Sequence, residues 1–156
     1  MKDAKLLDKS FKPTTLCYEM RELYQQDSQA VWQIIWLNLC LNSPLFNLYV
    51  SEIEWGNSWT KEELISLIEE KGYAKRTAIN AVNALTNTFE NSPFGEWFGR
   101  KFDKGKYLKA GLRVLSPFAM KYALSVLGEN PKLFEKIFGI NEKDFYYHYI
   151  IKLQKE

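Results

Sequence analysis

Residues 60–90 read TKEELISLIEEKGYAKRTAINAVNALTNTFE, and they predict two consecutive helices joined by a short turn. Thr60 and Glu63 have the spacing of a capping box, in which the threonine oxygen accepts a backbone amide and the glutamate reaches back. A glycine two residues after Glu70 favours the left-handed conformation at a helix end. We therefore expect one helix over about residues 60–71 and a second over about residues 74–90.

The second of these helices has two chemically different sides. Its apolar residues gather on one side, and the other carries Arg76, Asn80, Asn83 and Asn87 within about 60°. We call this set the asparagine stripe. Solvated helix faces more often use Glu and Lys, because these residues favour helix more than Asn does. In the major groove of DNA, asparagine bonds bidentately to adenine and arginine to guanine. The stripe therefore predicts base readout; the alternative is that its asparagines are ordinary surface residues or bond to neighbouring helices.

A basic segment follows the helix pair. Residues 94–115 combine glycines, cations and alternating apolar residues, which predicts a β-hairpin turning at Asp103-Lys104-Gly105-Lys106. A hairpin of this kind beside the stripe would reach DNA phosphates, which position a protein without specifying sequence. Lysines also protect exposed edge strands from aggregation, so the hairpin alone indicates little. The candidate phosphate contacts, including two at the start of the second helix, are Lys75, Thr77, Arg100, Lys101, Lys104, Lys106 and Lys109.

Charge is unevenly distributed along the chain. Residues 71–113 hold nine basic and three acidic side chains, a net charge of +6, whereas the whole chain carries only +2. The remainder must therefore sum to −4. This asymmetry favours one face suited to phosphates.

The complete pattern predicts a mainly α fold built on a winged helix-turn-helix with one small β-hairpin. We expect an N-terminal helical arm over residues 1–54, the winged unit over 55–127, and C-terminal helices over 128–156 packed on the same core. The arm contains a long helix that is apolar around most of its circumference and ends before Ser43-Pro44. Its residues Trp32, Ile35, Trp36 and Leu39 are expected to be buried.

Composition argues against several other classes of protein. Cys17 and Cys40 are far apart, and His148 is the single histidine, so no metal site or acid–base pair is expected. We expect no cofactor, and no constellation typical of an enzyme is evident. Apolar runs are too short for a membrane helix, and residues 1–12 have no apolar signal-peptide core. These observations predict a cytoplasmic protein.

Several short phrases resemble the C-terminal region of phosphoadenosine phosphosulfate reductase-like proteins, which occur in bacterial mobile-element and DNA-modification neighbourhoods. The similarity spans most of the chain, but its phrases are packing motifs rather than a catalytic signature. The nucleotide-binding domain of that family is not present: the chain has no glycine-rich phosphate loop and no reactive cysteine pair. The resemblance implies an accessory, DNA-facing module that works with a separate enzyme. Its phrases are Trp32-Gln33-Ile34-Ile35, Asn38-Leu39, Asn42-Ser43, Leu48-Tyr49-Val50, Arg76-Thr77, Ala84-Leu85, Phe94-Gly95-Glu96 and Ile137-Phe138-Gly139-Ile140.

The sequence thus predicts a binding module for double-stranded DNA, with an accessory or regulatory role. The alternative is an adaptor subunit whose winged helix docks a protein partner, since winged folds serve both purposes. What discriminates the two is whether the stripe and the hairpin lysines form one exposed basic face. Independently of this choice, residues 145–149 are typical of a packed terminal helix, and the alternative is that the tyrosines at 146, 147 and 149 provide a surface for self-association.

Overall fold

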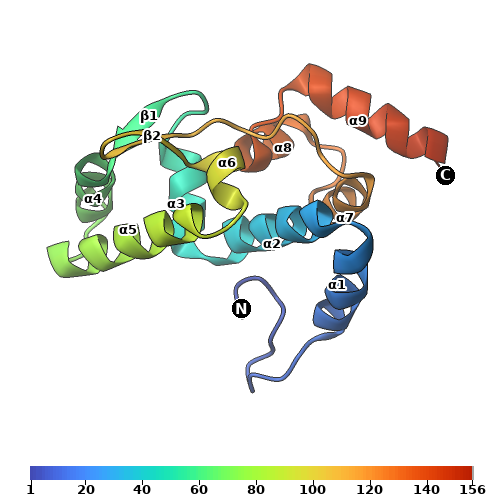
Figure 1. Cartoon of the computed structure of the whole chain (residues 1–156), viewed down its shortest axis with the longest axis horizontal. Coiled ribbons are helices and arrows are strands. Elements are labelled where there is room, and N and C mark those ends of the chain that lie inside the picture. The colour runs from blue at the N-terminus through green and yellow to red at the C-terminus, as the bar shows by residue number, and fades with distance from the viewer. Residues whose placement is uncertain (156) are drawn as a thin grey trace. The chain divides into compact units, whose positions relative to one another are not determined.

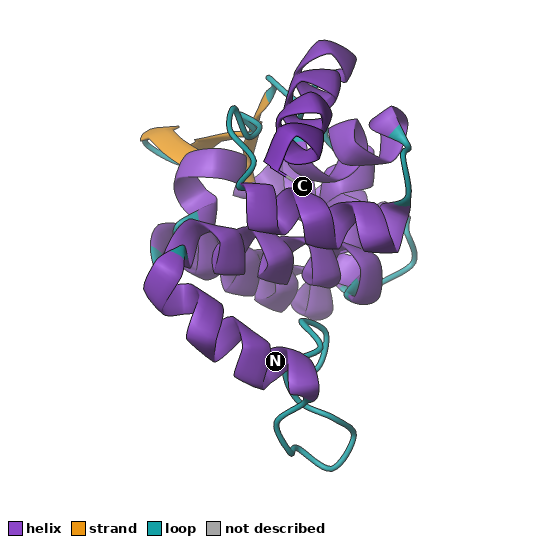
Figure 2. Ribbon diagram, turned by 90° about the vertical axis from the view of Figure 1, so that its right-hand side faces the viewer, coloured by secondary structure: helices purple, strands orange, loops and turns teal. Residues whose placement is uncertain are grey.

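The computed structural model describes residues 1–155, with the side chains of residues 1–150. This part of the chain is mainly helical, as Figure 2 shows by colour. It contains nine helices and one three-stranded antiparallel sheet. It divides into two compact units: Met1–Asn47 together with Leu112–Glu156, and Leu48–Gly111. The first is called the helical unit here and the second the mixed unit.

In the helical unit, α2 (Ser28–Asn42) contacts α1, α7 and α8, and α9 packs on α7 and α8. Local signals set the bounds of these helices. The Asp27 side chain caps α2 by accepting from the amide of Ala30 at 3.0 Å, and Ser116-Pro117 opens α7. The other helices of this unit are α1 (Thr15–Gln26), α7 (Pro117–Leu127), α8 (Pro131–Phe138), α9 (Glu142–Lys155) and the first residues of α3 (Pro44–Glu52).

The buried side of α2 differs in part from the expected one. Trp36 is 0% exposed, as predicted, and its indole N–H donates to the carbonyl of Ile137 at 2.7 Å. Trp32, Ile35 and Leu39 are only half-buried, so their expected burial is corrected. Polar side chains take the interior positions instead, because distant loops satisfy them. Gln33 bonds to the backbone of Val114 and Ser116, while Asn38 bonds to the Ala4 carbonyl and the Tyr122 hydroxyl.

In the mixed unit, the order along the chain is helix, strand, helix, helix, short helix and hairpin (Figure 1). The strands lie in the order β1-β3-β2, all antiparallel, with Trp59 opposite Tyr107 in the first pair. The elements are the last residues of α3, β1 (Ser58–Thr60), α4 (Lys61–Glu70), α5 (Lys75–Glu90), α6 (Phe94–Phe98), β2 (Arg100–Asp103) and β3 (Lys106–Leu108).

The predicted helix pair is confirmed. Both bonds of the capping box form: the Glu63 amide donates to Thr60 Oγ1 at 3.2 Å, and the Thr60 amide donates to Glu63 Oε2 at 3.0 Å. Gly72 separates α4 from α5 with a φ of +96°, a conformation that glycine adopts without steric cost. The hairpin turn at Lys104 and Gly105 is also confirmed.

The hairpin is shorter than expected, and β1 was not expected at all. Residues 94–98 form the helix α6, in which Phe94 and Phe98 are buried one turn apart. This helix packs closely against α5, and its glycines permit the approach. A Cβ at Gly95 would lie 2.1 Å from the Phe89 carbonyl oxygen, and one at Gly99 would clash with the Phe89 ring. The helix α6 and its close packing on α5 therefore depend on tertiary contacts, which the local sequence pattern does not reveal.

The unit boundaries also differ from the expected ones. The mixed unit begins at Leu48, within α3, rather than at residue 55, and ends at Gly111 rather than at 127. Helix α7, expected in the winged unit, belongs to the helical unit through its packing on α2 and α9. The C-terminal helices α8 and α9 join the same helical unit as the N-terminal arm.

Among the described residues, no single helix is long and apolar enough to cross a membrane. Helices α2 and α3 would meet the criteria only jointly, and they are bent by 94° where they meet.

Replacing Trp36 with alanine tests the centre of the helical unit. The substitution removes a fully buried indole and leaves the Ile137 carbonyl without its donor, so we expect a loss of about 3 to 5 kcal/mol in unfolding free energy. Urea denaturation measures it. A loss under about 1 kcal/mol would show that this helix is not the core of the unit.

Candidate nucleic-acid interface

Helix α5 presents the asparagine stripe to solvent. Arg76, Asn80, Asn83 and Asn87 are all exposed. The opposite side of the helix is buried in the mixed unit through Ala78, Val82, Leu85, Thr86 and Phe89. The two-sided character expected from the sequence is therefore present, and the stripe is not consumed by packing.

Two members of the stripe already have partners within the protein. Lys61 Nζ, at the start of α4, donates to Asn83 Oδ1 at 3.4 Å, and Asn91 Nδ2 donates to Asn87 Oδ1 at 2.8 Å. Both bonds use the oxygen that would accept from adenine in a bidentate contact. Arg76 and Asn80 lie nearer the helix N-terminus, the end that contacts base edges in helix-turn-helix proteins.

The first turn of α5 suits an anion. Lys75 and Thr77 are exposed there, and no side chain caps the amides of that turn. Uncapped amides and the positive end of the helix dipole both attract phosphate.

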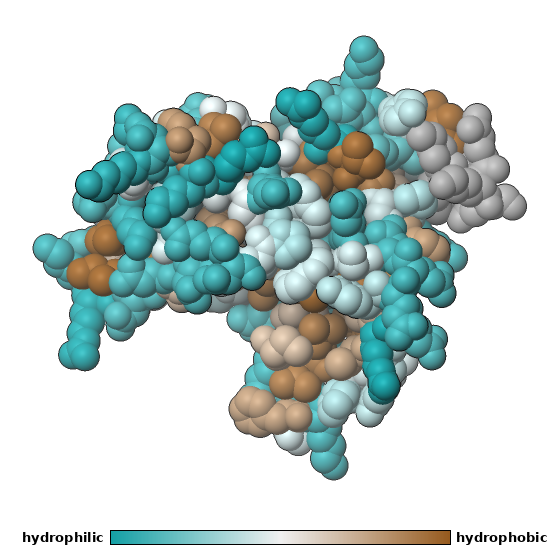
Figure 3. All heavy atoms as spheres, in the orientation of Figure 1, coloured by the Kyte–Doolittle hydropathy of each residue, from teal (hydrophilic) through white to brown (hydrophobic). Residues whose placement is uncertain are grey.

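The hairpin brings four of its five predicted cations to the surface. Arg100, Lys101, Lys104 and Lys106 are exposed. We call the segment Arg100–Leu108 the basic hairpin. Arg100 also donates to the Glu96 carbonyl at 3.3 Å, which ties the start of β2 to α6. The surface over α4 and α5 is mainly hydrophilic in the view of Figure 3.

Lys109 is not available to DNA, and the prediction for it was wrong. Its side chain is 0% exposed, and Nζ donates to the carbonyls of Tyr49 and Val50, each at 3.1 Å, and to that of Ile53. The ammonium lies 4.2 Å from the centre of the Trp55 ring. It caps the C-terminal end of α3, where the helix dipole attracts a cation. Of these carbonyls, that of Tyr49 also accepts from the Ile53 amide at 3.4 Å. Strand alternation could have indicated the burial of Lys109 from the sequence. Residues two apart in a strand lie on the same face, and Lys109 follows the buried Tyr107 by two residues.

Glu90 joins the stripe to the hairpin, and sequence reasoning missed it. It lies three residues after Asn87, one turn further along the same side of α5. Lys101 Nζ is 3.3 Å from Glu90 Oε1, and the Tyr107 hydroxyl donates to the same oxygen at 3.0 Å. These two bonds, first that from Tyr107, hold the pKa of Glu90 below its ordinary value. Burial and then the bond to Glu90 raise the pKa of Tyr107.

The mixed unit is strongly dipolar along its sequence. Residues 48–70 contain six acids and one base, whereas residues 71–111 contain eight bases and three acids. Four of the acids are exposed glutamates of α4: Glu62, Glu63, Glu69 and Glu70. A hollow of about 430 Å³ is lined by Glu52, Glu54 and Glu63 together with apolar groups including Trp59 and Leu64. Glu52 is also ion-paired with Lys71 at 2.7 Å, and their hydrogen bond raises the pKa of Lys71.

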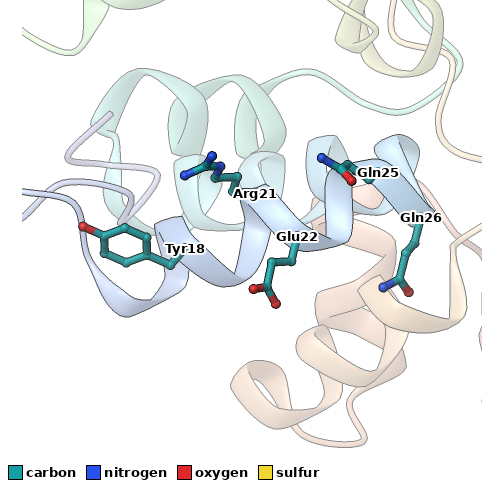
Figure 4. A pocket seen from close by; sticks show the side chains of 5 residues that line it. All are labelled: Tyr18, Arg21, Glu22, Gln25 and Gln26. Atoms are coloured by element: carbon teal, nitrogen blue, oxygen red, sulfur yellow. The ribbon is translucent and has the colours of Figure 1, made fainter.

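The helical unit offers a second hollow, of about 470 Å³, lined by residues of α1 alone. Figure 4 shows that its side chains point in separate directions and do not converge on a common point: Tyr18, Arg21, Glu22, Gln25 and Gln26. Among the side chains of residues 1–150, no three His, Cys, Asp or Glu are grouped to hold a metal ion.

Comparison of the chain with protein-family models, with curated proteins and with solved structures finds no match. The resemblance to the reductase-like family therefore stays a prediction, and the functional argument depends on the surface described above.

Lys109→Met keeps most of the unbranched side chain and removes the ammonium group. Buried carbonyls at the end of α3 then lose their donor, so we expect unfolding free energy to fall by about 2 to 4 kcal/mol. Lys104→Met, on the exposed turn, is the matched control and should change it by less than about 0.5 kcal/mol. Equal effects in denaturant unfolding would contradict the capping role.

Glu90→Gln tests the bonds between α5 and the hairpin. Because the folded pKa of Glu90 is lowered, its contribution to stability is present above the ordinary pKa of 4.5 and is lost as pH falls through the folded value. The side chain is 43% exposed, so the contribution is small, below about 1 kcal/mol. Wild type should be the more stable protein at neutral pH, with the difference shrinking on acidification below pH 4.5. A difference independent of pH would contradict this assignment.

Proposed function

We propose that the mixed unit is a winged helix-turn-helix that binds double-stranded DNA. The order helix, strand, helix, helix and hairpin, with the short helix α6 before the hairpin, supports this assignment, as does the strand order β1-β3-β2. One observation carries the function: the exposed side of α5 meets a cation from α4, Lys61, and a cation from the hairpin, Lys101, through Asn83 and Glu90. The predicted reading helix and the predicted wing therefore share one surface.

In the proposed complex, α5 lies in the major groove with its N-terminal half against base edges. Arg76 would bond to a guanine and Asn80 to an adenine, the pairings that their geometries favour. Lys75 and the α5 amides would meet one phosphate strand. Arg100, Lys104 and Lys106 of the basic hairpin would meet another, which fixes orientation without reading sequence.

In the protein without DNA, Glu90 fixes the position of the Lys101 side chain. It holds Lys101 against α5 and repels phosphate at the C-terminal end of the stripe. A DNA phosphate that approaches Lys101 must compete with this carboxylate. The pair therefore favours contact by the N-terminal half of α5, where the helix dipole and Lys75 act in the same direction.

The resemblance to reductase-like proteins supports a biological setting for this activity. We infer an accessory or regulatory module of a bacterial mobile-element or DNA-modification system, in which a separate enzyme supplies the chemistry. From this role on DNA we infer a location in the bacterial cytoplasm.

The acidic part of the mixed unit favours a second candidate, an adaptor that binds a basic protein segment. The α4 glutamates would repel phosphate, and the hollow beside them has a carboxylate rim with apolar walls. Such a site suits a lysine or arginine side chain, whose stem is apolar and whose end is cationic.

Single substitutions in the protein, assayed on a selected DNA duplex, separate residues that read bases from residues that contact phosphates. Asn80→Ala or Arg76→Ala should weaken binding to the preferred duplex by about 1 to 3 kcal/mol and relax discrimination at one base pair. Lys104→Ala should weaken binding to all duplexes alike and lower the slope of log affinity against log salt by about one.

The same variants test the adaptor. If none of them changes DNA affinity, while Glu63→Gln abolishes binding of a basic protein partner, the DNA-binding proposal fails. If Asn80→Ala and Lys104→Ala give equal, sequence-independent losses, the unit binds DNA without reading it, and the role given to the stripe is wrong.

A further inference from the structure

Phe102 occupies an irregular position in the basic hairpin. In the ladder between β2 and β3, Lys101 pairs with Tyr107 and Asp103 pairs with Lys106. The register shifts between Lys101 and Asp103, so Phe102 is the extra residue of a β-bulge. Bulges frequently redirect a side chain at functional sites and are built features rather than defects.

The fold does not use this phenylalanine. Its side chain is 54% exposed, and every residue of β2 is exposed. The aromatic that anchors the hairpin is Tyr107 of β3, which is 1% exposed and stacks on Trp59 with ring centres 4.7 Å apart. An exposed apolar ring at a redirected position therefore has a free face toward solvent that packing does not explain.

The surroundings of Phe102 are cationic. Lys101 and the acidic Asp103 flank it in sequence, Lys104 lies in the turn and Lys106 follows the turn, so the local sequence carries three exposed cations and one exposed carboxylate. One apolar side chain among lysines fits poorly with an apolar protein partner, which would have to desolvate those charges. It fits a polyanion that has an apolar interior, which is the chemistry of stacked bases between phosphate strands.

We propose that Phe102 is an apolar wedge that enters the minor groove of duplex DNA and partly unstacks one base step. Proteins that insert such wedges kink the duplex, and the lysines beside the wedge neutralise phosphates at the groove edges. The inference rests on the proposed DNA binding and adds the class of complex: a bent duplex, with α5 in the major groove and the basic hairpin in the adjacent minor groove.

Energy transfer between dyes at the two ends of a short duplex measures the bend. Wild-type protein should bring the ends together, and Phe102→Ala should abolish this change and weaken binding on the order of tenfold. The salt slope should stay constant, because no charge is removed. Phe102→Leu, which keeps an apolar wedge, should retain most of the bend. The matched control is Phe118→Ala, which removes a phenylalanine that is 48% exposed on α7 of the helical unit, and it should behave as wild type.

The outcomes separate this inference from the proposal beneath it. If wild type binds duplex DNA and Phe102→Ala binds and bends it equally well, the wedge is wrong and the DNA-binding proposal stands. A second outcome is that wild type does not bend the duplex but binds single-stranded DNA, and that Phe102→Ala and Phe102→Leu both lose this single-strand binding. The residue then stacks on unpaired bases, and the wedge is again wrong. If wild type binds no duplex at low salt, both fail.

Discussion

The buried ammonium of Lys109 is the interaction on which the mixed unit depends. It caps the last carbonyls of α3, lies over the Trp55 ring, and belongs to a residue whose backbone bonds to Gly56 and Asn57. One side chain thereby fixes the end of β3 to the end of α3. A buried cation is costly unless it is fully bonded, and here three carbonyls satisfy it. Lys109 directly follows β3, so these bonds anchor the C-terminal end of the hairpin that carries the exposed cations and the bulge.

From that anchor the candidate interface follows in steps. The β3 residue Tyr107 stacks on Trp59 and bonds to Glu90 at the end of α5, and Glu90 in turn holds Lys101 of β2. These side-chain bonds link the sheet, the predicted reading helix and the cations, in addition to the apolar packing of α5 through residues such as Phe89, whose ring centre lies 6.3 Å from that of Trp59. Along its sequence the unit has an acidic segment, residues 48–70, and a basic segment, residues 71–111, with no net charge overall.

Local signals made most of the helices predictable from the sequence. Each of these signals acts on residues only a few positions away along the chain, and each marks a helix end in the structure: the Thr60 capping box, Gly72, Asp27 and Pro117. The features that the sequence did not predict depend on tertiary contacts. Helix α6 exists because Gly95 and Gly99 let it approach Phe89, and β1 exists because β3 pairs with it. The buried Gln33 and Asn38 are satisfied by loops distant in sequence, which periodicity does not reveal. Of the candidate site, the exposed stripe followed from helical periodicity, whereas Lys109 was misplaced and Glu90 overlooked.

The most direct test is nuclear magnetic resonance of the isotopically labelled chain during titration with duplex DNA at low salt. The account predicts amide shifts in the N-terminal half of α5, around Arg76 and Asn80, and in the basic hairpin around Phe102 and Lys104. The amides of the α4 glutamates should stay in place, because like charge keeps them from phosphate. Shifts centred on the hollow lined by Glu52, Glu54 and Glu63, or no shifts at all with excess DNA, would contradict the account.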